Sequence, residues 1–359
     1  MKKWRLAAVS ALIAVLVICL FLALFPSGAS SANALELWYI SGDCSDKALE
    51  AAVASYNRRT GKQARSIKLQ CFEDEAALGA AFETDMPDLL LCSHAKAVQL
   101  NSRAVLAKLE TATDIYTQDV SGLEGVGEYF FPLGASVTVL ITDSAKCKAA
   151  GLPTSWDGLD ALLDTAQSYA SSNGGAFLAA DSYAAVLRDA LISLGTDLDP
   201  AAPDAKSDDY TRIYNALALC AYNGGLSAEA SQPGDLPCTL ARSTVLGGSL
   251  SSQLSAALLP LPEGGKDIRP AELLGVAVLR RDNESPDAAF AFIDWLCGKT
   301  RLSKLALSSG LVPVSKLGSA AASPLLSLYD CGKLSFADID EAAAQEFDAR
   351  FRRTIELLG

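Results

Sequence analysis

The stretch from Tyr129 to Leu159 divides the sequence into two regions that each alternate strands and helices. Its first half contains the run Val137–Thr142, in which apolar β-branched residues alternate with others, and this pattern predicts a strand. A turn and a short helix ending at Gly151 follow, and Thr154 or Ser155 is placed to cap a further helix. We interpret the stretch as a crossover between two lobes, so function is expected in the cleft between them.

The region before the crossover has the pattern of an α/β lobe. Its predicted strands are Leu35–Ile40, Ile67–Phe72 and Leu89–Cys92, and its predicted helices are Asp46–Thr60 and Glu75–Phe82. Strands separated by helices of this length favour parallel pairing with right-handed crossovers. Ligands of such sheets bind beyond the carboxyl ends of the strands, which here are Ser41-Gly42-Asp43 and Ser93-His94.

The region after the crossover repeats this alternation with different lengths. Its predicted helices are Trp156–Ser171, one capped by Asp181-Ser182 and running to Gly195, and Tyr210–Tyr222, and its predicted strands are Ala176–Ala179, Ser243–Leu246 and Ala257–Leu261. A later apolar strand, Leu273–Leu279, precedes helices at Ala288–Leu296 and Leu302–Ser308, and we expect this block to return to the first lobe. The predicted division is therefore residues 35–135 with 273–318, residues 136–272, and C-terminal helices in residues 319–359.

The N-terminus has the pattern of an export signal. Lys2, Lys3 and Arg5 precede an apolar run over residues 6–25, and Ala32-Asn33-Ala34 offers an A-x-A cleavage site. About 20 apolar residues are also long enough to anchor the chain in a bilayer. We favour cleavage between Ala34 and Leu35, but either reading places residue 35 onward outside the cytoplasm, at the cell surface or in the periplasm.

Charge and motif content exclude several functional classes. The 359 residues carry a formal net charge of −12, and no cluster of Lys and Arg is present, which argues against a nucleic-acid partner. No C-x-x-C pair supports a zinc site, and no cofactor is expected. Eight cysteines follow Ala34, an even number that permits disulfides, but Cys71, Cys92, Cys220 and Cys297 lie in apolar patterns typical of free buried thiols. Their pairing state stays open.

Four stretches occur in an order that resembles a known family. They are the opening strand and helix of Leu35–Gln63, "DMPDLLLCS" at Asp85–Ser93, "AAGLPTSWDGLDALL" at Ala149–Leu163, and the segment from "LLPLPEGG" through "SPDAAFAFIDWLCG" to "SSGLVPV" at Leu258–Val314. The sequence thereby resembles the extracellular solute-binding proteins of ABC importers, in particular family 1. The resemblance implies a type II periplasmic-binding-protein-like α/β fold with two lobes and crossover hinge strands. It also implies a monomer without catalytic residues that carries a small molecule, by family default a carbohydrate, to ABC permease subunits in the membrane.

Candidate ligand-binding residues in the first lobe follow its strands. Asp43 could accept hydrogen bonds from ligand hydroxyls, although it or Ser45 could instead cap the next helix. Ser41 lies in the same turn. Ser93 and His94 follow the third strand, and a lone histidine is more often a surface or capping residue than a ligand contact.

Further candidates lie at the crossover and in the second lobe. Tyr129 and Phe131 flank the crossover and could stack on a ring, or pack at the hinge. Asp181, Ser182 and Tyr183 open a helix whose N-terminus suits an oxygen-rich group, and Gly248 and Ser249 offer the same geometry. The structural alternative for Asp181, Ser182 and Tyr183 is that the first two residues cap the helix and the tyrosine packs in the core.

Two other functions remain compatible with the sequence. One is a membrane-anchored ectodomain that senses a ligand through a signalling partner. The other is a secreted hydrolase, for which a single histidine and the lack of a G-x-S-x-G motif leave little catalytic material, while 42 acidic residues prevent exclusion of a carboxylate pair by counting. We therefore do not expect an enzyme.

Overall fold

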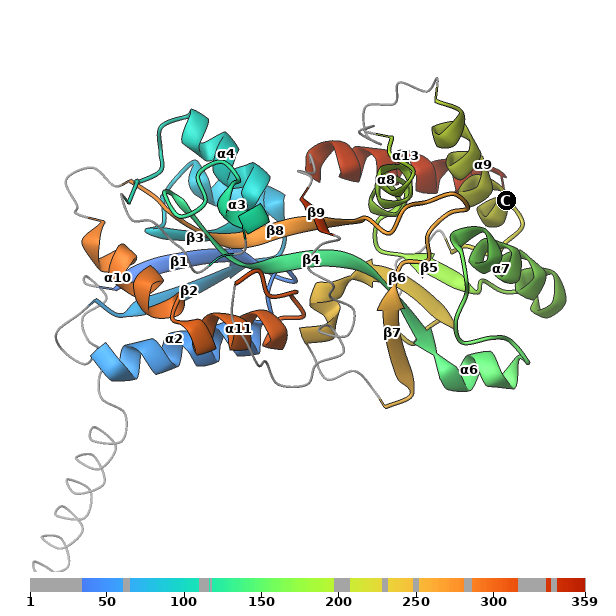
Figure 1. Cartoon of the computed structure of the whole chain (residues 1–359), viewed down its shortest axis with the longest axis horizontal. Coiled ribbons are helices and arrows are strands. Elements are labelled where there is room, and N and C mark those ends of the chain that lie inside the picture. The colour runs from blue at the N-terminus through green and yellow to red at the C-terminus, as the bar shows by residue number, and fades with distance from the viewer. Residues whose placement is uncertain are drawn as a thin grey trace, which may run out of the picture.

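One continuous sheet of nine strands runs through both halves of the molecule (Figure 1). The computed structural model describes residues 34–60, 65–109, 116, 118–196, 207–227, 232–247, 252–280, 286–315, 334–336 and 341–358. Its strands are β1 (Leu35–Ile40), β2 (Ile67–Phe72), β3 (Leu89–Ser93), β4 (Phe130–Asp143), β5 (Leu178–Ala180), β6 (Cys238–Arg242), β7 (Leu254–Leu258), β8 (Arg269–Val278) and β9 (Leu334–Phe336).

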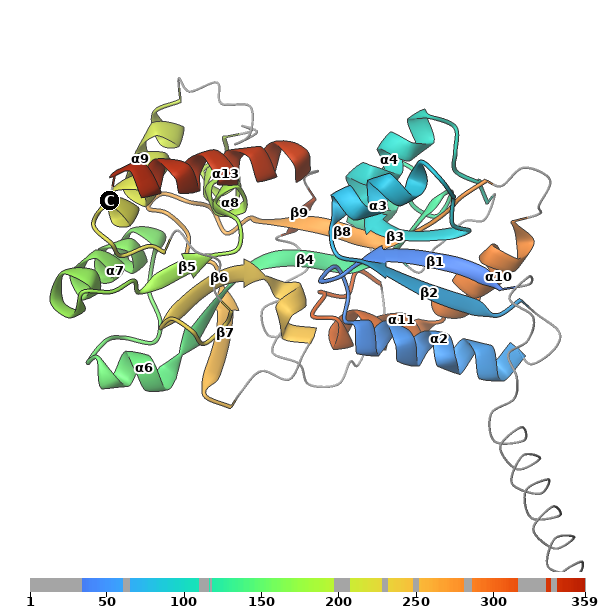
Figure 2. The same ribbon diagram turned by 180° about the vertical axis from the view of Figure 1, so that it is seen from behind.

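Helices cover both faces of the sheet in each half, as the two opposite views show (Figure 2). They are α2 (Asp46–Thr60), α3 (Glu75–Phe82), α4 (His94–Ser102), α5 (Gln118–Ser121), α6 (Ser144–Ala149), α7 (Leu159–Asn173), α8 (Tyr183–Ser193), α9 (Asp208–Tyr222), the 3-10 helix η2 (Ser243–Gly247), α10 (Asp287–Leu296), α11 (Lys299–Ser308) and α13 (Glu341–Leu358). Among these described helices, none combines the length and apolar character needed to cross a membrane.

The sheet is parallel at its two ends and antiparallel in its middle. Strands β2, β1 and β3 are parallel in one half, and β5 and β6 are parallel in the other. The long strands β4 and β8 join these ends and pair antiparallel with each other. β4 also pairs with β6 and β7, so its 14 residues cross from one half to the other. β4 and β8 are therefore the strands that bridge the two halves of the molecule.

Buried side chains form two hydrophobic clusters, which we call the first-lobe core and the second-lobe core. The first contains the inward faces of β1, β3 and β8 together with α10 and α11. The second contains those of α7, α8 and α9 with β5 and β6. Phe347 and Phe351 of α13 belong to the second core, so the C-terminal helix packs on the second lobe rather than standing apart.

Most predicted elements occur within a few residues of their expected bounds. β1, α2, β2 and α3 match their predicted ranges, and Ser182 caps α8 by accepting a hydrogen bond from the backbone N–H of Ala185 at 3.1 Å. The predicted short helix after the crossover is α6, and the crossover strand is longer than the predicted run.

Two element predictions were wrong, and one strand was missed. The segment Ser243–Leu246 is not a strand but part of η2, and the strand that precedes it, β6, was missed. The helix expected from Trp156 begins at Leu159, with Gly158 as a cap that lacks a side chain. The Trp156 indole Nε1 donates to Thr165 Oγ1 at 3.0 Å, so the tryptophan packs back on the helix instead of starting it.

Candidate functional site

Three charged side chains from three elements meet at the junction of the lobes. Arg242 Nη2 lies 2.9 Å from Glu272 Oε2, and Arg242 Nη1 lies 3.8 Å from Asp43 Oδ1. Asp43 follows β1 of the first lobe, Arg242 ends β6 of the second lobe, and Glu272 lies on the bridging strand β8. We call Asp43, Arg242 and Glu272 the junction cluster.

Strand register explains why the two members on the sheet are neighbours. Glu272 pairs with Ser136 of β4, and Arg242 pairs with Thr138 of the same strand. Positions two apart on a strand face the same side of a sheet, and directly paired residues share that side. Glu272 and Arg242 therefore project from one face on either side of β4, close enough for an ion pair.

Burial raises the free-energy cost of keeping the side chains of the junction cluster charged. The side chain of Glu272 is 6% exposed and that of Asp43 is 15% exposed, while Arg242 retains 34% exposure. Among the described residues, Glu272 Oε1 and the Ser136 hydroxyl have no hydrogen-bond partner. A buried acceptor without a partner is costly, so the charge of Glu272 depends on the nearby Arg242 guanidinium for stabilisation.

Asp181 adds a further carboxylate next to the cluster. It follows β5, and its backbone N–H donates to the Leu240 carbonyl at 2.9 Å. Desolvation by the surrounding protein raises the pKa of Asp181, while the positive charges of Arg242 and Arg352 oppose that rise. The cluster therefore borders an acidic group whose charge is balanced by two arginines.

Arg352 of α13 fixes the C-terminal helix against this end of the second lobe. Its Nη2 donates to the carbonyl oxygens of Ala180 and Asp181 at 3.1 and 3.2 Å. Its guanidinium also lies over the Tyr183 ring, 5.1 Å from the centroid. Arg352 is therefore a packing and hydrogen-bonding residue of the second lobe.

The first-lobe candidates separate into accessible and enclosed residues. Ser41 is exposed, and Asp43 belongs to the junction cluster. Ser93 is buried and caps α4 by accepting from the Lys96 N–H at 3.3 Å. His94 is 7% exposed, with Nε2 2.8 Å from the Glu124 carbonyl oxygen, so its ring is engaged within the lobe.

The crossover aromatics lie inside the first-lobe core. Tyr129 is 1% exposed and donates to Glu124 Oε1 at 3.2 Å. Phe131 is 2% exposed and packs edge-on against Phe290. Neither ring presents a face to a ligand, because both side chains are almost completely enclosed. Hinge packing, the alternative that the sequence left open, describes both residues.

The second-lobe candidates fall into three groups. Asp181 lies beside the junction cluster, and Ser182 caps α8. Tyr183 is fully buried, packs at a tilt against Phe351 with 4.8 Å between ring centroids, and donates to the Ser227 carbonyl. Gly248 and Ser249 lie outside the described residues. The structure therefore brings Asp43 and Asp181 toward one junction and assigns Tyr183 to the core.

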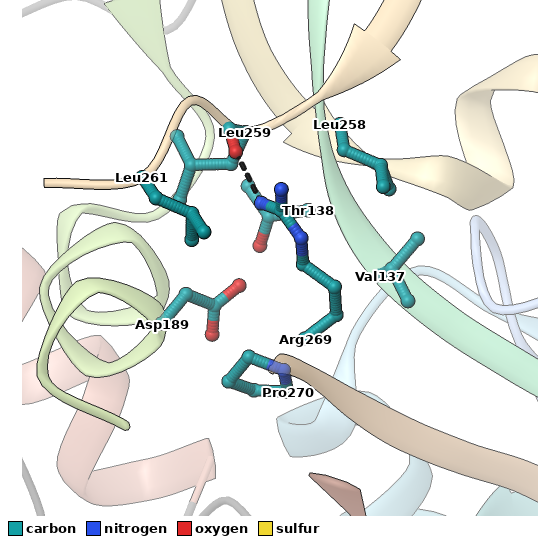
Figure 3. Close-up of a pocket in the computed structure, with 8 residues that line it drawn as sticks. All are labelled: Val137, Thr138, Asp189, Leu258, Leu259, Leu261, Arg269 and Pro270. Carbon is teal, nitrogen blue, oxygen red and sulfur yellow. Dashed lines mark hydrogen bonds between the residues drawn. The ribbon is translucent and has the colours of Figure 1, made fainter. Parts of the chain in front are cut away.

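Two hollows lie between the second lobe and the bridging strands β4 and β8. Figure 3 shows the smaller, of about 10 Å³, where the Arg269 side chain crosses between Asp189 and Leu259 and donates to the Leu259 carbonyl oxygen. This volume is too small for a ligand. A larger hollow of about 330 Å³ shares Arg269 and adds Trp156 and Asp157. It is bordered by second-lobe residues and the start of β8, without a contribution from the first-lobe strand ends.

Arg242 and Glu272 are the functional candidates that the sequence analysis missed. Glu272 directly precedes the apolar run Leu273–Leu279. A carboxylate next to a buried strand is expected to be buried itself and to need a charged partner, and this was the available signal. Arg242 immediately precedes the segment that was misread as a strand, so its position at a strand end was hidden. No group of His, Cys, Asp and Glu within the described residues is arranged to hold a metal ion.

Comparison with solved structures shows the fold. UgpB from Mycobacterium tuberculosis, in complex with glycerophosphocholine, is 16% identical with a TM-score of 0.70, covering 91% of this chain and 98% of its own. Lmo0181 from Listeria monocytogenes, an ABC substrate-binding protein in complex with cycloalternan, is 11% identical with a TM-score of 0.71, covering 90% and 94%. The cyclic alpha-maltosyl-1,6-maltose binding protein from Arthrobacter globiformis is 16% identical with a TM-score of 0.67, covering 90% and 94%. These similarities confirm the predicted periplasmic-binding-protein-like fold class.

Comparison with families gives the assignment. A search of curated proteins found no match. The family model for the bacterial extracellular solute-binding protein matches residues 51–325, which is most of the sequence and includes Arg242 and Glu272 of the junction cluster, while Asp43 precedes the matched residues. The predicted resemblance is therefore confirmed, and this chain belongs to the family of bacterial extracellular solute-binding proteins.

Proposed function

We propose that the chain captures a small, hydroxyl-rich solute at the junction of its lobes and delivers it to an ABC permease, without transforming it. The family assignment supports binding and export. The junction cluster is the observation that supports this position for the solute-binding site. It joins a first-lobe carboxylate, a second-lobe guanidinium and a bridging-strand carboxylate. A solute held there contacts both lobes, which is the condition for ligand-driven closure.

The chemistry of the cluster favours a polyhydroxylated ligand such as a carbohydrate. Carboxylates accept hydrogen bonds from hydroxyl groups, and a guanidinium donates to their oxygens. Several solved structures with this fold are described as sugar-binding proteins, which supports the same class.

Recognition in this protein is proposed to depend on charged hydrogen bonds more than on aromatic stacking. Trp38 and Tyr39 of β1 are only 2% and 3% exposed. Tyr129, Phe131 and Tyr183 are also buried. A ligand ring therefore finds none of these aromatic faces open, and loss of a single charged group is expected to have a large effect.

Thermal unfolding with a ligand panel tests the proposal. Maltose, maltotriose, galactose, glycerophosphocholine and spermidine are each added in excess, and at least one carbohydrate is expected to raise the Tm. A ligand at 100 times its Kd stabilises the native state by about 2.7 kcal/mol. Mass spectrometry of the recovered ligand is expected to show it unchanged. Stabilisation by spermidine alone would overturn the hydroxyl-rich class, and a changed ligand mass would overturn binding without turnover.

Variants of the cluster test the location. Asp43→Asn and Glu272→Gln keep the side-chain shape and are each expected to weaken carbohydrate binding at least tenfold, about 1.4 kcal/mol. Glu346→Gln is the matched control, because Glu346 is 73% exposed on α13 and pairs with Arg350 at the surface. Full affinity in both cluster variants would place the ligand elsewhere.

A further inference from the structure

Two cysteines of the second lobe lie against each other although both are thiols in the structure. Cys238 is the first residue of β6 and pairs with Thr142 near the end of β4. Cys147 lies on α6, which begins directly after β4 and turns back over the start of β6. The thiol of Cys238 lies 3.9 Å from Thr142 Oγ1, and that of Cys147 lies 3.9 Å from the Pro237 carbonyl oxygen.

Backbone contacts hold the two segments together. The Asp143 N–H donates to the Pro237 carbonyl at 2.8 Å, next to the position of Cys238. Asp143 also caps α6, accepting from the N–H groups of Ala145 and Lys146 at 2.9 and 3.0 Å. The orientation of Cys147 is thus fixed by the same residue that positions the chain before Cys238.

The neighbouring Cys238 thiol lowers the pKa of Cys147, and the neighbouring Cys147 thiol raises the pKa of Cys238. Both side chains are fully buried in the second-lobe core. Several other cysteines have different neighbours: Cys44 contacts Ser309, Cys297 contacts Tyr116, Cys220 contacts the Leu163 carbonyl and Cys71 is exposed.

We propose that Cys147 and Cys238 form a disulfide in the exported protein. The chain belongs to an extracellular family, and disulfides form and persist in oxidising compartments outside the cytoplasm. The proposal does not depend on the identity of the ligand or on the junction cluster. It settles one pair of the cysteines whose pairing the sequence left open.

The oxidation requires a partner of defined chemical class. The Cys147 thiolate attacks one sulfur of a disulfide in an exported thiol–disulfide oxidoreductase, which forms a mixed disulfide and releases one partner thiol. Cys238 then loses its proton and attacks the Cys147 sulfur, so the protein disulfide forms and the second partner thiol leaves. Two protons and two electrons pass from the cysteines, and the partner disulfide is reduced to two thiols. Because both sulfurs are enclosed in the folded lobe, the reaction occurs during folding after export.

The cross-link would stabilise the second lobe through its unfolded state. It closes the segment from residue 147 to residue 238, which contains α7, β5, α8 and α9. Linking distant points restricts the unfolded chain more than linking near ones. Loss of the bond is therefore expected to lower the Tm by about 5 to 10 °C.

Peptide mapping of the full chain, produced with export and unfolded in a thiol-blocking alkylator without reductant, tests the proposal. The expected product is one peptide pair joining Cys147 to Cys238, about 2 Da lighter than its two free-thiol peptides because two hydrogens are lost. Complete alkylation of both cysteines, or linkage of either to another cysteine, would overturn the proposal.

Stability variants provide a second readout. Reductant during refolding is expected to lower the Tm of the wild type and of Cys71→Ser, a control at an exposed cysteine. The double variant Cys147→Ala and Cys238→Ala should have a lower Tm than the oxidised wild type, and reductant should not change the Tm of this variant. If the double variant does not fold, Cys147→Ala alone is mapped, and Cys238 is expected to become fully alkylated. An equal response of the double variant and the wild type to reductant would also overturn the proposal.

Discussion

At the residue scale, the guanidinium of Arg242 joins carboxylates from opposite sides of the lobe junction. Glu272 is nearly enclosed, and a carboxylate in that setting is costly without a counter-charge. Arg242 supplies the charge at 2.9 Å and still reaches toward Asp43 at 3.8 Å. The same side chain therefore has a structural role in the free protein and an expected recognition role when a solute is present.

Removing Arg242 is expected to destabilise the protein by more than the loss of a surface ion pair. Arg242→Ala leaves Glu272 buried without its partner, and we expect a loss of about 2 kcal/mol in the free energy of unfolding. Combining it with Glu272→Gln is expected to recover part of that loss, because the buried charge is gone. Urea unfolding of both single variants and the double variant measures the coupling. Arg350→Ala, at a 57% exposed position, is the control, and a cost for Arg242→Ala no larger than for this control would contradict the expectation.

Because Tyr129 is buried, its substitution is expected to affect stability and not ligand affinity, whereas a residue that stacks on the ligand would affect affinity. Tyr129→Phe keeps the ring and removes only the hydrogen bond to Glu124, so we expect a loss of about 1 kcal/mol in stability and no change in ligand affinity. Calorimetric titration with the ligand found by the panel checks the second part. Tyr222→Phe, at a 57% exposed position, should change neither quantity. A tenfold loss of affinity in Tyr129→Phe would return this residue to the site.

At the element scale, α13 docks on α8 through a carboxylate. Asp348 accepts a hydrogen bond from the Ala184 N–H in the first turn of α8 at 2.8 Å. Desolvation raises the pKa of Asp348 above its ordinary 3.8, while the hydrogen bonds and Arg352 oppose that rise. The folded protein thus favours the protonated form more than the unfolded chain does.

This pKa shift gives a pH dependence of defined sign. The stabilising contribution of protonated Asp348 is present at acidic pH and is lost as the pH rises through the raised pKa. Asp348→Asn stays neutral, and its amide oxygen can still accept from Ala184. The stability of Asp348→Asn relative to the wild type is therefore expected to increase from acidic to neutral pH, measured by urea unfolding across the range. Asp348→Ala loses the acceptor as well and should be the less stable of the two variants at neutral pH. A difference between Asp348→Asn and the wild type that is constant with pH would contradict the assignment.

The sequence predicted elements well where local signals agreed and failed where tertiary packing decided. The helix α2 follows from its apolar stripe and Gly61 stop, and its bounds were predicted correctly. Strand β6 was missed because Cys238–Arg242 has little β-branched content, and its pairing with β4 and β5 defines it instead. Register with β4 also aligns Arg242 and Glu272, which lie 30 positions apart in the sequence. No local pattern could have predicted that ion pair.

At the scale of the whole molecule, the lobes are joined by more than their bridging strands. The end of α11 in the first lobe lies against η2, which follows Arg242. Gly310 is at φ +72°, and a Cβ there would meet the Ser243 carbonyl oxygen and lie 2.7 Å from the Gly247 nitrogen. Only glycine combines this left-handed backbone with such a close approach. The contact sets the distance between η2 and the first lobe, and hence the position of the junction cluster.

Substituting Gly310 therefore tests whether this contact controls the lobe arrangement. Gly310→Ala pays for the left-handed backbone and also forces η2 away from α11, so we expect a loss of about 3 kcal/mol in stability. Gly151→Ala is the matched control, because Gly151 has φ +68° but nothing lies within 4 Å of an added Cβ, and it should lose only about 1 kcal/mol. Displacement of η2 moves Arg242 relative to Asp43, so Gly310→Ala should also weaken solute binding and enlarge the radius of gyration in small-angle X-ray scattering. Equal stability losses in the two variants, with an unchanged radius and affinity, would show that the lobes are positioned by β4 and β8 alone.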